Sequence, residues 1–553
     1  MDTRQDPLFL PDAEQFSLAV DSAVAQCRDL FASYIAKADS IPSSLDPFGI
    51  AASFQRFSLQ LARNPLPLWE TQWQFWLDSL GLWQHAANRI SLSASENPSV
   101  NQASDRRFRD PEWSTNPLFD FIRQTYLVLA NGLLHLASHT EGLEAKDAQK
   151  IAFYTKQFVD AVSPSNFALT NPEVIRTTIE QGGANLVEGF KNLLNDIDAS
   201  SGQLRTKMVD PSAFELGRNI ATTPGFVVFQ NDLMQLIQYS PTTEKVHERP
   251  LLIIPPWINK YYVLDLQPHN SFIKWAVANG HTVFVISWVN PDSSLSDKDF
   301  SDYMKEGPLA ALDAVESATG EHCCNVIGYC LGGTLLAATL AYMATKRDER
   351  VSSATFFTAM LDFSDPGDLG VFVDEQQVSH LEMEMASRGF LDGKEMAATF
   401  NLMRDSDLIW SFVINNYLLG KAPAPFDLLY WNSDSTRMPA RMHSTYLRKM
   451  YMENLLACPG AFSLDDVSLD LGKIAAPSCF VSALEDHIAP WKSTFAGAKL
   501  LSGPVKFILG KPGHIEGSIN PPGPKAYAHF VGPEPAGEAD AWLRDADLQA
   551  GSW

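Results

Sequence analysis

The stretch that most constrains the fold of this chain runs from Asn325 to Ala338 and reads NVIGYCLGGTLLAA. It begins with an apolar, β-prone run and ends with small and apolar residues at helical spacing. Between the two lies Cys330, with Gly328 and Gly332 two residues before and after it. This order predicts a strand, a tight turn and a helix, with the thiol at the turn.

The turn Gly328–Gly332 matches the G-x-S-x-G pattern of a nucleophile elbow, with sulfur in place of oxygen. In an elbow the nucleophile lies on a strained turn, and the two glycines let the strand and the helix approach closely. The backbone N–H of Leu331, at the start of the helix, then points toward an oxyanion that forms beside the sulfur. The alternative interpretation is a buried structural cysteine in a glycine-rich turn.

Length and charge exclude several classes of protein. The chain has 553 residues, enough for roughly two to four domains. Its 42 basic and 65 acidic residues give a net charge of −23, which argues against nucleic acid and anionic membrane surfaces as partners. Six cysteines without C-x-x-C or Cys/His spacing indicate a reduced, cytosolic protein with no structural metal. The N-terminus lacks the apolar core of a signal peptide, and the uncharged run Cys323–Thr345 is too polar for a membrane span.

Residues 1 to about 220 predict an all-helical N-terminal domain. Apolar residues recur at helical spacing in Asp12–Lys37 and Gly49–Ala62, and further helices are expected at about 117–140 and 146–162. Asn171 followed by Pro172 has the chemistry of a helix start.

A stripe of bulky apolar residues recurs at helical spacing after Pro65 and Pro67, at Trp69, Trp73, Trp76, Leu77, Leu80 and Trp83. It has two interpretations. Either it packs against neighbouring helices, or it forms an exposed face that touches a partner or an apolar surface.

From about residue 221 the pattern changes to alternating strands and helices, which predicts an α/β domain with a parallel sheet and helices on both faces. Residues 221–553 are therefore predicted to form a catalytic domain of the α/β-hydrolase fold. An insertion at about 360–450 is helical and aromatic-rich, and it is predicted to cover the active site as a cap. Strands are expected at Phe226–Gln230, Met234–Tyr239, Leu251–Ile254, Thr282–Trp288, Ser353–Thr358, Ser478–Ala483 and Val505–Leu509.

Two late loops provide candidates for a base and an acid, in the order expected after an elbow nucleophile. His514 lies on a Gly/Pro loop after a strand and is predicted to remove the thiol proton of Cys330. Asp486 is predicted to orient and stabilise the imidazole, with the adjacent Glu485 as the competing carboxylate. His487 is either a surface residue or a residue that supports the substrate site.

Three segments resemble the catalytic segments of polyhydroxyalkanoate synthases: Cys330 in GYCLGGT, Asp486 in EDHIAPW and His514 in GHIEGSINPP. The similarity extends over nearly the whole chain. The long helical N-terminal region and Tyr-Cys-Leu at the elbow resemble the single-polypeptide class I enzymes. Further stretches that resemble the family are Pro255–Tyr262, Ser287–Asp292, Pro425–Asn432, Asp105–Trp113 and Ser163–Pro172.

The resemblance implies a transferase that polymerises (R)-3-hydroxyacyl-CoA, with short-chain 3-hydroxybutyryl-CoA as the expected monomer, into polyester. Cys330 would hold the acyl group as a thioester, and the N–H groups of Leu331 and Ile258 would meet the oxyanion. Asp486 would act through His514 or directly on the incoming 3-hydroxyl. CoA enters as part of the thioester substrate and leaves as a product, so no separate cofactor is expected.

The resemblance also implies partners and secondary site residues. The growing polyester chain or granule is an expected partner, and a homodimer that contacts through the cap and a cytoplasmic, granule-bound location are expected. Asp265 matches a family carboxylate near the site, with a helix-cap role as the alternative. Arg404 would meet CoA phosphates, with a surface ion pair as the alternative. Trp431 is expected in the core of the cap or in a subunit contact.

Two other functions compete with synthesis. A cysteine-type acyl hydrolase, either a thioesterase or a polyester depolymerase, is equally compatible with the elbow. A non-catalytic scaffold would bind granules through the stripe Trp69–Trp83. At the C-terminus a helix is expected at Ala536–Ala550, with Trp542, Leu543 and Leu548 buried on one face.

Overall fold

The structure is a computed structural model that describes residues 46, 49–64, 66–91, 105–197 and 204–553, without the side chains of residues 83–91. It contains two compact units, Met1–Ala94 with Gln124–Val159 and Ser95–Arg123 with Asp160–Trp553. The division into domains at about residue 220 stays a prediction, and the helix expected at Asp12–Lys37 lies outside the described residues. No helix within the described ranges is long and apolar enough to cross a membrane.

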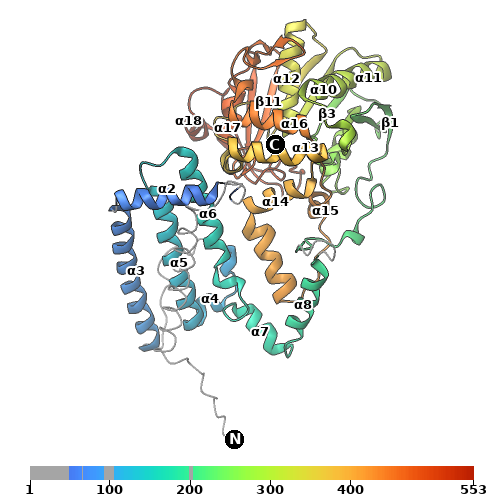
Figure 1. The fold of residues 1–553 in the computed structure, drawn as a ribbon. Coiled ribbons are helices and arrows are strands. Elements are labelled where there is room, and N and C mark those ends of the chain that lie inside the picture. Colours follow the sequence, from blue (N-terminus) through green and yellow to red (C-terminus); the bar gives the residue numbers. More distant parts are fainter. Residues whose placement is uncertain (1–45, 47–48, 65, 92–104, 198–203) are drawn as a thin grey trace. The chain divides into compact units, whose positions relative to one another are not determined.

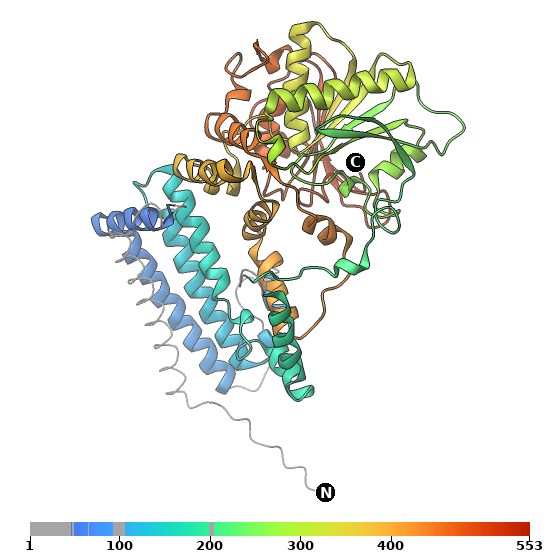
Figure 2. The ribbon, with the colours of Figure 1, turned by 45° about the vertical axis from the view of Figure 1, so that its right-hand side comes forward.

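The described part of the first unit is built from helices. Phe54, Phe57, Ala137 and Ile151 form its buried core, as expected from their spacing. Figures 1 and 2 show α3 beside α5, and a Cβ at Gly132 of α5 would lie 3.5 Å from a methyl group of α3. The helices predicted from sequence are confirmed as α2 (Ile50–Arg63), α3 (Leu66–Ser91), α5 (Pro117–His139) and α6 (Ala145–Ala161).

The stripe on α3 is exposed. Trp69, Trp73 and Trp76 have relative exposures of 64%, 68% and 59%, and Leu77 and Leu80 are also exposed. The interpretation as core packing is therefore wrong for these five residues. The side chain of the sixth member of the stripe lies outside the described part of the chain.

The helix start predicted before the sheet is confirmed. The side chain of Asn171 accepts hydrogen bonds from the N–H groups of Glu173 and Val174, and Pro172 occupies the first turn of α7 (Pro172–Glu180). The N-cap interaction satisfies backbone donors that a helix start leaves unpaired.

The second unit is built around a ten-stranded sheet in the order β1-β2-β4-β3-β5-β6-β11-β12-β13-β14 (Figures 1 and 2). The strands from β4 to β12 in this order run parallel, and antiparallel strands flank them at both edges. The sheet confirms the predicted α/β class. Its strands are β1 (Gly225–Gln230), β2 (Met234–Tyr239), β3 (Leu251–Ile254), β4 (Val283–Trp288), β5 (Cys324–Tyr329), β6 (Val351–Phe357), β11 (Ser478–Ala483), β12 (Val505–Gly510), β13 (His529–Val531) and β14 (Asp547–Gln549).

Alternate residues of the central strands enter two separate cores, because successive side chains of a strand point to opposite faces. In β3, Leu252 and Ile254 belong to one core, whereas Leu251 and Ile253 belong to the other. Helices α10 (Phe300–Met304), α11 (Ala310–Thr319), α12 (Leu331–Lys346), α17 (Trp491–Ala498) and α18 (Ala539–Asp545) supply the first core. Helix α9 (Phe272–Ala278) supplies the second. Burial on both faces explains why these strands read as continuous apolar runs.

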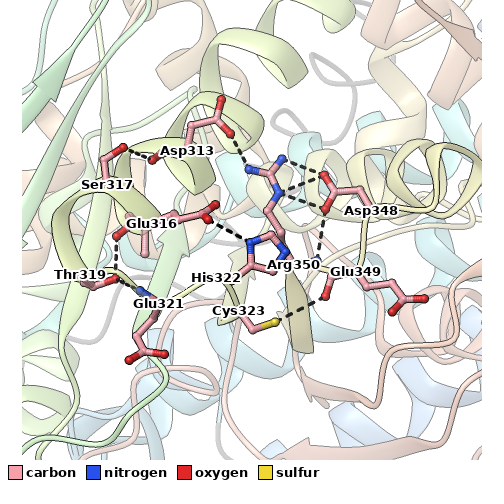
Figure 3. A network of polar contacts seen from close by, with 11 residues as sticks. Asp313, Glu316, Ser317, Thr319, Glu321, His322, Cys323, Asp348, Glu349 and Arg350 are labelled. Carbon is pink, nitrogen blue, oxygen red and sulfur yellow. Dashed lines mark hydrogen bonds and ion pairs between the residues drawn. The ribbon is translucent and has the colours of Figure 1, made fainter.

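A network of polar contacts lies at the amino-terminal ends of β5 and β6 (Figure 3). Arg350 donates hydrogen bonds to the carboxylates of Asp348 and Asp313, so it ties the start of β6 to α11. The Cys323 thiol lies 3.9 Å from the carbonyl oxygen of Glu349. This thiol is therefore at the end of β5 away from the elbow.

Residues 358–477, all of them described, add no strand to the main sheet, as predicted for an insertion. Their short strands pair only with one another, β7 (Phe390–Leu391) with β8 (Met438–Pro439) and β9 (Ser463–Leu464) with β10 (Val467–Ser468). The helical elements of the insertion include α13 (Glu375–Arg388), α14 (Gly393–Met403), α15 (Asp427–Ser433), α16 (Ala440–Tyr446) and the π-helical turns η9 (Val413–Leu418) and η10 (Leu447–Met452).

Helix α8 (Ala184–Asp196) holds part of this insertion. A Cβ at Gly189 would lie 1.9 Å from the carbonyl oxygen of Tyr417, so only glycine permits this approach of α8 to η9. The Tyr417 hydroxyl donates to Asp196 at 2.8 Å, and Asn185 donates to the Leu418 carbonyl at 2.9 Å. Contacts between segments more than 200 residues apart in sequence thus fix the position of η9.

The C-terminal helix is shorter than expected. Helix α18 ends at Asp545, and β14 follows it and pairs with β13. Trp542 is buried as predicted, but Leu548 is 53% exposed, so its predicted burial is wrong. Pairing with the edge of the sheet competes with helix formation here, because the strand conformation satisfies backbone groups of β13.

Candidate active site

Cys330 lies on a sharp turn between β5 and α12. Its backbone has φ 52° and ψ −121°, a conformation that costs free energy for a residue with a side chain. Its N–H donates to the Phe357 carbonyl at 2.8 Å, and its own carbonyl accepts from the N–H groups of Gly333 and Thr334. The predicted strand, tight turn and helix are confirmed, with the thiol at the turn.

The glycines on either side of Cys330 allow the close approach that the pattern predicts. A Cβ at Gly332 would lie 2.0 Å from the Ile254 carbonyl oxygen, and one at Gly328 would lie 2.5 Å from the Cα of Gly333. Both distances are far below normal contact, so neither position accepts a side chain without movement of the backbone.

Replacing Gly332 by alanine is expected to lower the free energy of unfolding by about 1–3 kcal/mol, the usual cost of overpacking. The added methyl group meets backbone atoms at the end of β3, which cannot turn aside as a side chain can. Gly81→Ala is the control, because nothing lies within 4 Å of a Cβ at that helical position. Chemical denaturation measures both variants, and wild-type stability of Gly332→Ala would contradict the packing argument.

Asp486 and His514 come from separate loops and meet directly. Oδ2 of Asp486 lies 2.7 Å from Nδ1 of His514. The other carboxylate oxygen accepts the N–H groups of Ile488 and Ala489, each at 2.8 Å, which fixes the direction of the carboxylate. Glu485 is exposed. The structure therefore brings Asp486, and not its neighbour, against the imidazole.

The environment of His514 favours its protonated form. Burial lowers the pKa of His514, but the nearby Asp486 carboxylate and the Cys330 sulfur, each hydrogen-bonded to the imidazole, raise it above the ordinary value. The ring lies 5.7 Å from that of Tyr329, centroid to centroid. The imidazole thus contacts both the thiol and the carboxylate, and both contacts raise its affinity for a proton.

The two residues predicted to supply oxyanion donors belong to adjoining segments. Leu331 is the first residue of α12, and Ile258 lies on the loop that follows β3. Both side chains are buried in the same core, and the close contact between Gly332 and Ile254 joins the two segments. Their roles stay predictions.

Asp265 is buried within hydrogen bonds of the protein itself. It accepts from the hydroxyls of Thr223 at 2.6 Å and Ser271 at 2.5 Å. Ser271, and not Asp265, is the N-cap of α9. Burial raises the pKa of Asp265, although these hydrogen bonds oppose the shift. Its observed contacts tie the loop after β3 to the segment before β1.

Arg404 and His487 are neighbours. Arg404 donates to Asp407 at 2.9 Å in a half-exposed ion pair, so the pairing considered as an alternative is present. Burial, followed by the positive charge of Arg404, lowers the pKa of His487 to about 4. The charges of Asp486 and His514 also act on His487, so the insertion that carries Arg404 reaches the loop that carries Asp486. Binding of CoA by these residues stays a prediction.

Trp431 packs into one of the two cores of the main sheet, and not into a separate core of the cap. It is 4% exposed, and its indole N–H donates to the Lys260 carbonyl at 2.7 Å. This contact joins α15 of the insertion to the loop after β3.

Tyr446 and Tyr451 are two residues beside Cys330 that the sequence did not predict. Tyr446 is buried and Tyr451 is half-buried, and both lie beside the Cys330 sulfur. Burial is the main cause that raises the pKa of each phenol; for Tyr446 the neighbouring Tyr451 and then the sulfur add to it, and for Tyr451 the sulfur adds to it while the hydrogen bond with Tyr446 opposes it. Their rings lie 5.4 Å apart and a hydrogen bond links them. Tyr446 ends α16 and Tyr451 lies in the π-helical turn η10 that follows. Residues five apart meet across a π-helical turn but not along an α-helix, so α-helical periodicity could not find the pair.

Two family models match the chain. Residues 104–276 match the model described as Poly-beta-hydroxybutyrate polymerase (PhaC) N-terminus. Residues 250–515 match the model of the alpha/beta hydrolase fold, which agrees with the sheet order and the elbow.

Relatives are similar over most of the chain. Poly(3-hydroxyalkanoate) polymerase subunit PhaC of Rhizobium meliloti (strain 1021) is 45% identical over 99% of this chain and 90% of the relative. Poly(3-hydroxyalkanoate) polymerase of Methylorubrum extorquens is 50% identical over 85% of this chain and 78% of the relative. The corresponding subunit of Cupriavidus necator is 40% identical over 88% and 82%. The chain therefore belongs to the poly(3-hydroxyalkanoate) polymerases, a family of enzymes, and its catalytic part has the α/β-hydrolase fold.

Proposed function

We propose that this protein polymerises (R)-3-hydroxyacyl-CoA, in particular short-chain 3-hydroxybutyryl-CoA, into polyester and releases CoA. Cys330, His514 and Asp486 form the catalytic triad of this proposal. The observation that supports it most directly is the 2.7 Å contact between His514 and Asp486 beside a thiol held on a strained turn.

Acylation uses the thiol as the nucleophile. His514 takes the proton of Cys330, and the thiolate attacks the thioester carbonyl carbon. The N–H groups of Leu331 and Ile258 hold the oxyanion. The carbon–sulfur bond to CoA then breaks, and the departing CoA sulfur receives the proton from His514. One thioester replaces another, so the step is nearly isoenergetic.

Elongation uses the same base. His514 takes the proton of a 3-hydroxyl group, and the oxygen of that hydroxyl group attacks the carbonyl carbon of the thioester on Cys330. An ester bond forms, the bond between carbon and the Cys330 sulfur breaks, and the sulfur receives the proton. Asp486 stabilises the imidazolium in both steps or acts directly on the hydroxyl.

Recognition of CoA requires a local cation, because the protein carries a net charge of −23. Arg404 is the proposed CoA-binding cation. It lies next to His487, and His487 is on the same loop as Asp486. Phosphate would compete with Asp407 for the guanidinium. Asp265 contributes indirectly, through the loop that carries Ile258.

The product distinguishes synthesis from hydrolysis. Incubation with 3-hydroxybutyryl-CoA is expected to release one thiol per monomer and to produce insoluble polyester. Free 3-hydroxybutyrate with the same thiol release would identify a thioesterase instead. Repeating the assay with longer 3-hydroxyacyl chains tests the short-chain preference.

The exposed stripe of α3 supports a location on polyester granules. The face formed by Trp69, Trp73 and Trp76 is bulky and apolar, which suits a neutral ester surface better than water. A cytoplasmic, granule-bound homodimer that contacts through the insertion at about 360–450 belongs to the same proposal.

Changing Trp69, Trp73 and Trp76 together to alanine is expected to weaken granule binding more than tenfold. Burial of each large apolar side chain contributes roughly 1.5–3 kcal/mol, so even partial burial of three indoles exceeds the 1.4 kcal/mol of a tenfold effect. Co-sedimentation with polyester particles measures binding. Gln72→Ala with Gln74→Ala is the control, because these exposed residues lie on the same helix. If both variants bound the particles equally well, the stripe would not be the granule-binding surface.

A further inference from the structure

The C-terminal residues Gly551, Ser552 and Trp553 contact the turn that carries His514. The indole N–H of Trp553 donates to the Gly517 carbonyl at 3.1 Å, and the Ser552 hydroxyl donates to the Asn520 carbonyl. His529 of β13 lies 2.9 Å from the Gly551 carbonyl oxygen. The tripeptide is thus fixed to the main sheet and to the segment just after the imidazole.

The contacted segment is a single compact turn. The N–H of Gly517 donates to the Gly513 carbonyl at 2.8 Å, so Gly517 closes the turn in which His514 is the second residue. The Ser518 hydroxyl donates to the carbonyl oxygen of His514 at 3.3 Å. Gly517 also lies against β11, because a Cβ there would come within 2.5 Å of Ala483. Displacement of Gly517 therefore displaces the backbone of His514.

The same indole reaches the backbone that holds the nucleophile. The Trp553 ring lies 5.2 Å from that of Phe357, with an interplanar angle of 67°. The carbonyl of Phe357 accepts the N–H of Cys330 at 2.8 Å. Trp553 also packs in the apolar cluster that contains Ile515 of the turn and Ile519, which follows the turn.

We propose that Trp553 is a positioning residue that sets the distance between His514 and Cys330. Its N–H holds the turn of the base, and its ring packs on the residue whose carbonyl holds the elbow. This inference rests on the proposed roles of Cys330 and His514. Catalytic rates are sensitive to such spacing, since misplacement of a reacting group by 1 Å costs about 100-fold.

Trp553→Phe removes the indole N–H and keeps an aromatic ring, whereas Trp553→Ala removes both. We expect kcat for CoA release to fall about tenfold in the first variant and about 100-fold in the second, with KM unchanged. The matched control is Trp542→Phe. The Trp542 indole N–H donates to the Pro533 carbonyl at 2.8 Å, but its ring lies in the other core of the sheet. This control is expected to lower the melting temperature without changing kcat.

A second readout separates positioning from stability. In Trp553→Phe the pKa of His514 is expected to fall toward its ordinary value, because the contacts with Asp486 and Cys330 that raise it become looser. NMR of the labelled imidazole measures it at a temperature where both variants are folded. Wild-type kcat and His514 pKa in Trp553→Phe would overturn the inference, as would an equal loss of kcat in Trp542→Phe. If Cys330→Ala kept its activity, the proposed function would fail instead.

Discussion

Replacing Cys330 by alanine is expected to abolish acyl-enzyme formation and CoA release. No neighbouring group replaces the thiolate, because the titratable side chains that interact with it are the phenols of Tyr329, Tyr446 and Tyr451 and the imidazole of His514. Mass spectrometry of the protein after incubation with 3-hydroxybutyryl-CoA measures acylation, and a thiol reagent measures release. More than trace polymerisation would contradict the assignment of the nucleophile.

Cys323→Ala is the matched control for this experiment. Cys323 is seven residues upstream, and its thiol lies against the Glu349 carbonyl at the opposite end of β5. A six-residue strand is roughly 20 Å long, so this thiol cannot reach a carbonyl held at the elbow. We expect wild-type activity. Cys330→Ser is expected to be very slow, because an alkoxide is harder to generate than a thiolate and leaves less readily.

Replacing His514 by glutamine is expected to prevent acylation, whereas Asp486→Asn is expected to allow a first acylation and to stall elongation. His514 is the only one of the two that contacts the thiol, so its loss blocks the first proton transfer. Asp486 acts on the imidazole, and its charge matters most when the weakly acidic 3-hydroxyl must be deprotonated. General-base catalysis typically contributes about 100- to 10,000-fold, which sets the expected loss of rate.

Measuring the pKa of His514 in Asp486→Asn tests the effect of the carboxylate on the imidazole independently of activity. The carboxylate raises the pKa of the imidazole above its usual value, so the variant is expected to lower it. A group with a raised pKa stabilises the folded state below its unfolded pKa, and this stabilisation is lost as the pH rises through the folded value. The variant should therefore lose the most stability below about pH 6.5, the ordinary pKa of histidine, and progressively less as the pH rises toward about 10, the pKa of His514 in the folded protein. Glu485→Gln is the control, because that carboxylate is exposed. Equal loss of acylation in His514→Gln and Asp486→Asn would exclude a separate part for Asp486 in elongation.

The fold class and the elbow could be predicted because each is indicated by a pattern of a few consecutive residues. Runs such as Leu251–Ile254 are apolar at every position, since both faces of a central parallel strand are buried, and this property is visible without tertiary information. The strained turn at Cys330 leaves no space for a side chain at Gly328 or Gly332. Such positions are visible in the sequence, because only glycine has no side chain. Asn171 and the proline after it likewise marked a helix start whose chemistry is local.

Other features depended on which surfaces meet. Periodicity identified the stripe of α3 as one helix face, but it does not state whether another element covers that face. The helix expected at Ala536–Ala550 was interrupted because an edge of the sheet offered backbone partners to β14. Tertiary context overrides local propensity in such cases.

The sequence by itself determined the order of Cys330, Asp486 and His514 along the chain and the strands that precede them. Only the tertiary structure decided that Asp486 rather than Glu485 contacts His514, because adjacent carboxylates differ in direction and not in chemistry. It also brought Tyr446 to the thiol and Trp553 to the turn that carries His514. These contacts join segments more than 30 residues apart, and their distances depend on how the sheet, the insertion and the C-terminal residues pack together. No local pattern encodes such distances, whereas burial, turns and helix caps are properties of a few consecutive residues.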